Sequence, residues 1–182
     1  MLLMMLMLMN SPSSATELLW EKIRAEPNIV LLMRHADAEP GNALRWDESG
    51  KCEGEVQLSE DGKDHARYIG VRFAARRLEP VVVSSPMCRC KETAVLAFGG
   101  SLATDPLLRE LPVSDTPQSA EAALKAKALI ASHRGKAPLV FVGHASNITQ
   151  LTHETVAESE AVVGIANADG DVAVLGKVVL TD

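Results

Sequence analysis

The sequence predicts a three-layer α/β fold, with a mostly parallel central sheet, helices on both faces and an antiparallel hairpin at the C-terminal edge. Short continuous apolar runs alternate with longer stretches of helical periodicity, and such runs are typical of strands buried on both faces of a parallel sheet. Near the end of the chain, strand-like runs at 161–166 and 172–180 flank the turn sequence NADG at 167–170, which predicts a hairpin.

Apolar runs mark the predicted strands. The first is NIVLLM at 28–33, the second is VVV at 81–83, and PLVFV occupies 138–142. A brief run at 102–104 is a further strand candidate. Strands that alternate with helices in this way favour an α/β layered fold.

Four helical stretches are predicted between and after these strands. Ser59 begins SEDGKDHARYIGVRFAARRL, which has a capping hydroxyl, two acids in its first turn and apolar residues at helical spacing. Pro80 ends this helix, and another begins after Pro86. An Ala-rich stretch at 118–133 carries Leu and Ile at helical spacing and ends in a cation and a glycine, as helix C-termini prefer. A further helical stretch follows His144.

Length and charge limit the organisation of the chain and its partners. The chain has 182 residues, and no repeat or Pro/Gly-rich linker divides it after residue 15, so residues 16–182 are predicted to form one domain. The formal net charge is -6, which argues against nucleic acid or anionic lipid as a partner. A phosphate site in this chain must therefore be a local cluster of cations.

The N-terminus carries a candidate leader. The first nine residues, MLLMMLMLM, are apolar, and residues 10–15 are small or polar and end in Ser-Ser-Ala. This pattern resembles the apolar region and cleavage site of a signal peptide, although no Lys or Arg precedes it. We expect residues 1–15 to be a signal peptide that directs export to the periplasm, or else a disordered leader on a cytoplasmic protein. The run is too short to span a membrane, which takes about 20 apolar residues.

Three cysteines, Cys52, Cys88 and Cys90, lie in or beside the segments with candidate chemistry. In an exported chain, Cys52 would pair with Cys88 or Cys90, because a disulfide between Cys88 and Cys90 is less plausible. Of these two pairs, we expect Cys52 with Cys90. In a cytosolic chain the thiols would stay reduced. No C-x-x-C or H-x-x-x-H spacing completes a zinc site, so no metal is expected.

Candidate functional residues follow the predicted strands. Ligands of open α/β sheets bind outside the carboxyl ends of the strands. The residues at those ends are Arg34 and His35 after the first strand, Ser84, Ser85 and Arg89 after the second, and Gly143 and His144 after 138–142. Two arginines and two histidines thus reach one edge of the sheet in an acidic protein.

This set of side chains suits a phosphoryl group. The planar fork of Arg matches two phosphoryl oxygens and keeps its charge, and helix N-termini add free N–H groups. A neutral imidazole nitrogen can attack phosphorus. A second histidine can hold the phosphate as a cation or a hydrogen-bond donor.

The same residues resemble the motifs of the histidine phosphatase superfamily, which includes phosphoglycerate mutases. The matching segments are LLMRH at 31–35, LSEDG at 58–62, SSPMCR at 84–89 with ETA at 92–94, and VGH at 142–144. The similarity extends from about residue 29 to residue 180. It implies a metal-independent and cofactor-free phosphatase in which His35 takes the phosphoryl group and Arg34, Arg89 and His144 hold it.

The resemblance also implies a carboxylic acid that protonates the leaving group, in a segment of the form L-x-E. Leu108-Arg109-Glu110 fits that segment, so Glu110 is the candidate acid. The aromatic and glycine residues that usually follow are absent, and Ala36 and Ala145 stand where glycine is frequent. The chain also lacks the long insertions of mutases, which favours hydrolysis over phosphoryl transfer to a second substrate.

These observations predict hydrolysis of a phosphomonoester, or of phosphohistidine, through a phosphohistidine intermediate on His35. The partner is then a small phosphorylated substrate or a phosphohistidine protein. Its specificity would depend on residues 37–57, including Arg45, Trp46 and Lys51, and on residues 111–117. One alternative is a non-catalytic phosphate-binding or partner-binding module of the same fold.

Another alternative is a metal hydrolase that uses His35, Asp37 and His144. The remaining histidines are expected to have structural roles at or within helices; they are His65, His133 and His153.

Overall fold

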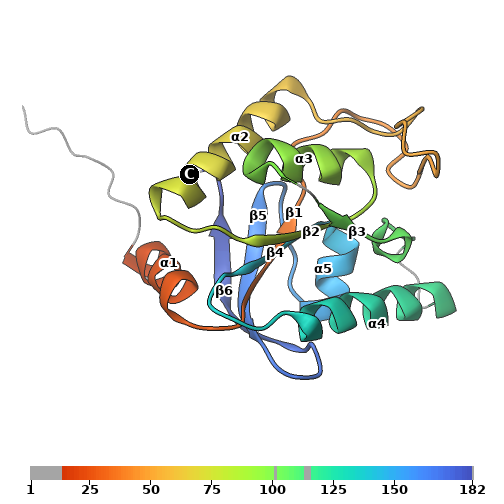
Figure 1. Ribbon diagram of the computed structural model, residues 1–182. Coiled ribbons are helices and arrows are strands. Elements are labelled where there is room, and N and C mark those ends of the chain that lie inside the picture. Colours follow the sequence, from red (N-terminus) through yellow and green to blue (C-terminus); the bar gives the residue numbers. More distant parts are fainter. Residues whose placement is uncertain (1–13, 101, 113–115, 182) are drawn as a thin grey trace, which may run out of the picture.

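A six-stranded mixed sheet forms the centre of the computed structural model, which describes residues 14–100, 102–112 and 116–181 (Figure 1). Its strands are β1 (Ile29–Arg34), β2 (Val81–Ser84), β3 (Ala103–Thr104), β4 (Leu139–Gly143), β5 (Glu160–Ala166) and β6 (Val172–Val179). The order across the sheet is β3-β2-β4-β1-β5-β6. The first four of these pair in parallel, whereas β5 is antiparallel to β1 and β6 to β5.

The predicted fold class is confirmed. Each apolar run forms a strand within one or two residues of its predicted bounds, and the C-terminal hairpin is β5 and β6. β1 and β4 are buried along nearly their whole length, as expected for central strands covered on both faces.

Helices cover both faces of the sheet, and Figure 1 shows α2 and α3 above it and α4 and α5 below it. Their bounds are α1 (Ser14–Ala25), α2 (Glu60–Ala75), α3 (Cys88–Phe98), α4 (Pro117–Ser132) and α5 (Ala145–Thr152), with a short 3₁₀ helix η1 (Pro106–Leu108). Ser59 caps α2 as predicted, because its hydroxyl accepts a hydrogen bond from the amide of Gly62. Thr116 caps α4 in a reciprocal box with Ser119.

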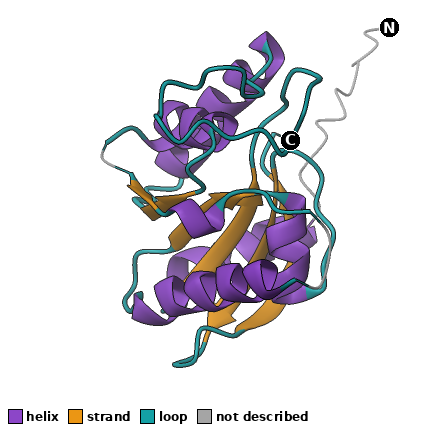
Figure 2. Cartoon of the chain, turned by 90° about the vertical axis from the view of Figure 1, so that its right-hand side faces the viewer, coloured by secondary structure: helices purple, strands orange, loops and turns teal. Residues whose placement is uncertain are grey.

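The core consists of two apolar layers, one on each face of the sheet. Successive residues of a strand point to opposite faces, so Leu31 and Met33 of β1 pack with α1, α2 and α3, whereas Val30 and Leu32 pack with α4 and α5. Figure 2 shows the sheet between these helical layers. The carboxyl ends of the parallel strands lie at one edge of this covered sheet and form a platform there.

The expected leader lies largely outside the described residues, which begin at Ser14. Within the expected boundary at residue 15, α1 has already begun. The sequence analysis did not predict this helix, which packs Trp20 and Ile23 against the first apolar layer. No helix in the described part of the chain is long and apolar enough to cross a membrane.

The prediction that Cys52 pairs with Cys90 is wrong. The structure joins Cys52 to Cys88, and Cys90 is a buried free thiol. Residues two apart on a helix point to different sides, so only one of the two can meet the loop that carries Cys52. Cys88 faces that loop, whereas Cys90 Sγ points inward and lies 3.6 Å from the carbonyl oxygen of Gly143. Burial raises the pKa of the Cys90 thiol to about 12.

Candidate active site

His35 lies at the exit of β1, and its amide extends the β1–β4 pairing by donating to Gly143 O. The ring is buried, and Nδ1 donates to the carbonyl oxygen of Ala36 at 2.8 Å. Nε2 accepts a hydrogen bond from Arg89 Nε at 3.1 Å. These two contacts place the proton on Nδ1 and leave a lone pair on Nε2. Burial, aided by the charge of Arg89, lowers the pKa of His35 to about 3, so the ring is neutral at physiological pH.

Arg89 is the largest fully buried side chain among the described residues. Its Nη2 group lies 3.0 Å from Ala43 O, 3.1 Å from His144 Nδ1 and 2.5 Å from Glu110 Oε2. Nη1 is buried and has no hydrogen-bond partner within the described part of the chain. A buried N–H group without a partner is costly, so an anion that reached Nη1 would be bound favourably.

His144 is the residue before α5, directly after β4. Its Nδ1 accepts from Arg89, which leaves Nε2 to donate to Ser85 Oγ at 2.9 Å. Its ring centre lies 5.5 Å from that of His35. Burial, followed by the charges of Arg89 and His35, holds the pKa of His144 well below its usual value. The ring is therefore a neutral acceptor toward the pocket, not the cation that the sequence analysis allowed.

Glu110 follows the short helix η1 and enters the same pocket. Its carboxylate pairs with Arg89, and Oε2 lies 3.6 Å from His144 Nδ1. The structure thus brings together four of the five predicted residues in direct contact: His35, Arg89, Glu110 and His144.

Arg34, the fifth predicted residue, ends β1 and is held at the rim of this edge. Its Nη2 pairs with Glu158 Oε1 at 2.9 Å, and each side chain is about one-third exposed (30% and 32%). Sequence reasoning missed Glu158. It lies just before β5, and because β5 runs antiparallel to β1, the start of one strand and the end of the other share an edge of the sheet. The predicted hairpin contained that signal.

Thr93, part of the quoted ETA segment, links α3 to the exit of β1. Its hydroxyl donates to Arg89 O at 2.7 Å and accepts from the amide of Ala36 at 3.1 Å. The peptide that orients His35 and the helix that carries Arg89 are thereby fixed to each other.

The loop of residues 37–57 is fastened to the start of α3. The buried carboxylate of Glu55 accepts from the amides of Cys88 and Asp47, at 2.8 and 2.9 Å, and the disulfide joins the same two segments. Of the residues predicted to confer specificity, Arg45 bonds within the loop to Glu53 O, and Trp46 stacks under the guanidinium of Arg109, 5.2 Å from its ring centre. In the predicted segment 111–117, residues 113–115 lie outside the described part.

The arrangement can hold a phosphoryl group between a neutral imidazole nitrogen and a buried guanidinium. Asp37, proposed for the metal alternative, directs its carboxylate to Ser59 rather than to His35. In the described ranges, no group of three or more His, Cys, Asp or Glu side chains is arranged to hold a metal ion. The structural role expected of His133 fits its contact with Ala137 O at the end of α4.

Comparison with known families agrees with this geometry. Residues 30–136 match the model of the histidine phosphatase superfamily, branch 1. The chain belongs to this family. The resemblance inferred from the motifs is thereby confirmed, and no curated protein matches the chain significantly.

Solved structures share the fold of this histidine phosphatase superfamily member at low sequence identity. The protein histidine phosphatase SixA, complexed with tungstate, has a TM-score of 0.57 and 19% identity, over 84% of this chain and 97% of that one. A mycobacterial glucosyl-3-phosphoglycerate phosphatase with inorganic phosphate has a TM-score of 0.60 and 16% identity, over 82% and 95%. A phosphoserine phosphatase from Entamoeba histolytica has a TM-score of 0.58 and 15% identity, over 82% of this chain and 95% of that one.

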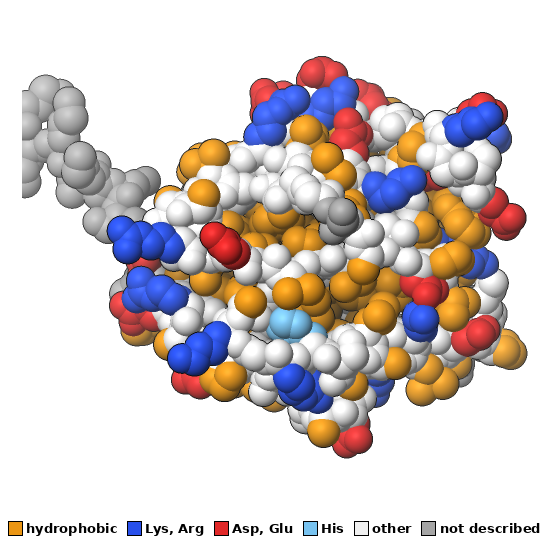
Figure 3. Space-filling view, in the orientation of Figure 1, with side chains coloured by type: hydrophobic (Ala, Val, Ile, Leu, Met, Phe, Trp, Pro, Cys, Tyr) orange, Lys and Arg blue, Asp and Glu red, His pale blue; other side chains and the backbone are white. Residues whose placement is uncertain are grey.

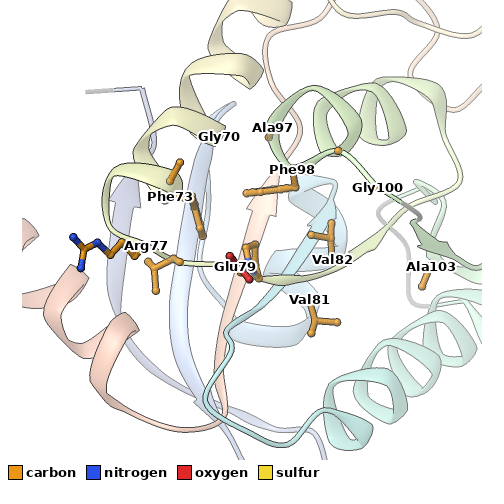
Figure 4. A pocket seen from close by; sticks show the side chains of 14 residues that line it. Gly70, Phe73, Arg77, Glu79, Val81, Val82, Ala97, Phe98, Gly100 and Ala103 are labelled. Atoms are coloured by element: carbon orange, nitrogen blue, oxygen red, sulfur yellow. The ribbon is translucent and has the colours of Figure 1, made fainter.

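An apolar hollow of about 800 Å³ in this superfamily member lies away from the site. It opens between the C-terminal ends of α2 and α3 and the start of β2 (Figure 3). Phe73 and Phe98 project into it and Arg77 points away (Figure 4). The hollow adjoins the amino end of β2, whereas Ser84 and Ser85 lead from its carboxyl end to the histidines. It therefore contributes nothing to the cationic pocket.

Proposed function

We propose that the protein is a metal-independent phosphatase that hydrolyses a phosphomonoester or a phosphohistidine through a covalent intermediate on His35. Membership of the histidine phosphatase superfamily supports phosphatase activity in general. The observation that carries the finer proposal is the contact between the unprotonated Nε2 of His35 and the buried guanidinium of Arg89, whose Nη1 has no partner in the described residues. A nucleophile and an anion-binding group thus meet at one point.

The first step forms a bond between His35 Nε2 and phosphorus and breaks the bond from phosphorus to the leaving oxygen. The Nδ1 proton stays on its hydrogen bond to Ala36 O, which stabilises the ring as it becomes cationic. Arg89 and Arg34 hold the remaining phosphoryl oxygens, and His144 donates to one of them when its proton lies on Nδ1 and Ser85 Oγ donates to Nε2 in return. Water then attacks phosphorus, so that inorganic phosphate leaves and neutral His35 is restored.

Proton delivery to the leaving oxygen is assigned to Glu110. In the unliganded pocket its carboxylate is paired with Arg89. An entering phosphoryl group competes for the same Nη2 and displaces the carboxylate, which can then take up a proton and pass it to the leaving group. Poor leaving groups depend on this acid more than activated aryl phosphates do.

Turnover of an aryl phosphate without added metal tests the proposal. His35→Ala should lower kcat by at least about 10³-fold, as loss of a nucleophile does, and a chelator should leave the wild type unchanged. His133→Ala, which removes a histidine outside the pocket, is the matched control. Retained activity in the His35 variant, or a requirement for a divalent ion, contradicts the proposal. A screen of sugar phosphates, a phosphohistidine peptide and aryl phosphate would identify the substrate class.

A phosphate-binding module without catalysis is the second candidate, and the pairing of Glu110 with Arg89 favours it. Phosphate or vanadate should raise the melting temperature in either case. Only the enzyme forms an acid-labile, base-stable phosphoryl adduct, and the adduct must disappear in His35→Ala.

We also propose that the protein works in an oxidising compartment, as the export signal expected at residues 1–15 would require. The bond between Cys52 and Cys88 supports this proposal, because disulfides persist in the periplasm and other oxidising compartments. A mature N-terminus found by mass spectrometry in a periplasmic extract would test it, and full-length protein confined to the cytoplasm would contradict it.

A further inference from the structure

Glu158 holds Arg34 at the edge of the pocket. Besides the ion pair with Arg34, the amide of the next residue, Ser159, donates to His35 O at 3.2 Å, and Ser159 O accepts from Leu180 N at 2.9 Å. Ser159 is buried and has a positive φ of 59°. The backbone that carries Glu158 is therefore fastened to the residue proposed as nucleophile and to the end of β6.

A second carboxyl group stands behind Glu158. The carboxyl of Asp37 is close enough to that of Glu158 to raise its pKa, because a neighbouring carboxylate disfavours ionisation of the second one. Asp37 also accepts from the hydroxyl of Ser59, the cap of α2. This contact is the main cause of the lowered pKa of Asp37, with smaller contributions from His65 on α2 and from His35.

As the pH falls, Glu158 therefore takes up a proton before Asp37 does. Burial raises the pKa of Glu158, and the Asp37 carboxylate raises it further, whereas Arg34 opposes the shift. When Glu158 is ionised, its charge competes with an incoming anion for Arg34. When it is protonated, it still accepts a hydrogen bond from Arg34 but no longer neutralises it.

We propose that Glu158, through its ion pair with Arg34, is a positioning residue that aims Arg34 at the phosphoryl group, and that protonation of Glu158 frees the charge of Arg34 to bind that group. This inference rests on the proposed function of the pocket. It predicts that anion affinity rises as pH falls through the titration of Glu158. His35 and His144 cannot cause the rise, because burial keeps both rings neutral until much lower pH.

Sulfate is the probe of choice because it stays a dianion throughout the range from pH 4.5 to pH 8. Calorimetric titration of the full chain should show sulfate affinity increasing about fivefold toward acid pH, the size expected of a charge pair at a partly exposed rim. Glu158→Gln, which keeps the acceptor oxygen and removes the charge, should bind with the acid-form affinity at every pH. Asp37→Asn should move the wild-type change to lower pH, because it removes the carboxylate that holds the proton on Glu158.

Two controls separate this effect from general charge. Glu154→Gln removes a carboxylate from the same loop and should keep the wild-type pH dependence. His65→Asn removes the imidazole that faces Asp37 and should also keep most of it. If the sulfate affinity of Glu158→Gln changes with pH as that of the wild type does, the inference is overturned.

Turnover at pH 7 tests the positioning role. Glu158→Ala should lower kcat by up to about 10²-fold, the loss that a 1 Å misplacement of a binding group can cause, and its melting temperature should show that the variant is folded. Glu158→Gln should recover most of that loss, and equal kcat in both variants and the wild type overturns the positioning role. If sulfate fails to bind the wild type at all, the anion pocket and the proposed function fall with the inference. If sulfate binds without the Glu158 dependence, only the inference falls.

Discussion

Burial sets the charge state of the two histidines in the pocket. His35 and His144 sit in the interior of an acidic protein, and both are neutral because desolvation outweighs every neighbour. Neutrality is what a nucleophilic imidazole needs. The same burial affects stability, because these two histidines bind protons in the unfolded chain at pH values where they stay unprotonated in the folded chain.

The free energy of unfolding should therefore fall as pH is lowered from about 6.5, the usual pKa of histidine, toward 3, the pKa of His35 in the folded protein. In this window the unfolded state binds more protons, and each buried histidine contributes a slope of about 1.4 kcal/mol per pH unit. Urea unfolding at several pH values measures it. His144→Asn should reduce the slope by about that amount, whatever its effect at pH 7.

The matched control is His153→Asn, because His153 is exposed and its left-handed conformation, φ 62°, suits Asn. It should leave the slope unchanged. An unchanged slope in the His144 variant would show that this ring is already protonated in the folded protein.

At the scale of elements, α2 approaches the exit of β1 more closely than any side chain would permit. A Cβ added at Gly62 would lie 1.9 Å from Asp37 O. Gly70, two turns later, meets α3 in the same way, with Ala97 O at 2.1 Å. One contact supports the site and the other supports only the packing of two helices.

Gly62→Ala and Gly70→Ala should each lower the free energy of unfolding by about 1–3 kcal/mol, as overpacking does. Only Gly62→Ala should also lower kcat of the folded protein, because it displaces the backbone beside His35. Denaturant unfolding and turnover under folded conditions separate the two effects. Equal kcat in both variants would mean that the β1 exit tolerates the shift.

For the molecule as a whole, the disulfide joins the loop of residues 37–57 to the platform of strand ends. It spans 36 residues of sequence, and cross-linking a loop of that length stabilises a fold by about 3–4 kcal/mol in the chain-entropy model. The loop also supplies Ala43 O to Arg89, so its attachment concerns the anion pocket as well as stability.

The double variant Cys52→Ser with Cys88→Ser should lose stability of this size and show a raised KM. A reducing agent should lower the melting temperature of the wild type but not that of the double variant, which is the internal control. A wild type insensitive to reduction would show that the loop is held by Glu55 alone.

Sequence patterns predicted most of the fold because the strands at 28–33 and 138–142 are apolar along their length and the helices carry caps such as Ser59. Local signals of this kind depend only on neighbours in the chain. They did not predict α1, because its apolar residues Trp20 and Ile23 are buried only by packing against α2 and the sheet, which are distant in sequence.

In the candidate active site, the sequence by itself determined the chemical set of His35, Arg34, Arg89, Glu110 and His144, since each follows a strand or belongs to a family motif. Only the tertiary structure decided how they are used. It put the proton of His35 on Nδ1, paired Glu110 with Arg89, brought Glu158 to Arg34 and chose Cys88 over Cys90. These outcomes depend on burial and on contacts between distant segments, which spacing along the chain does not encode.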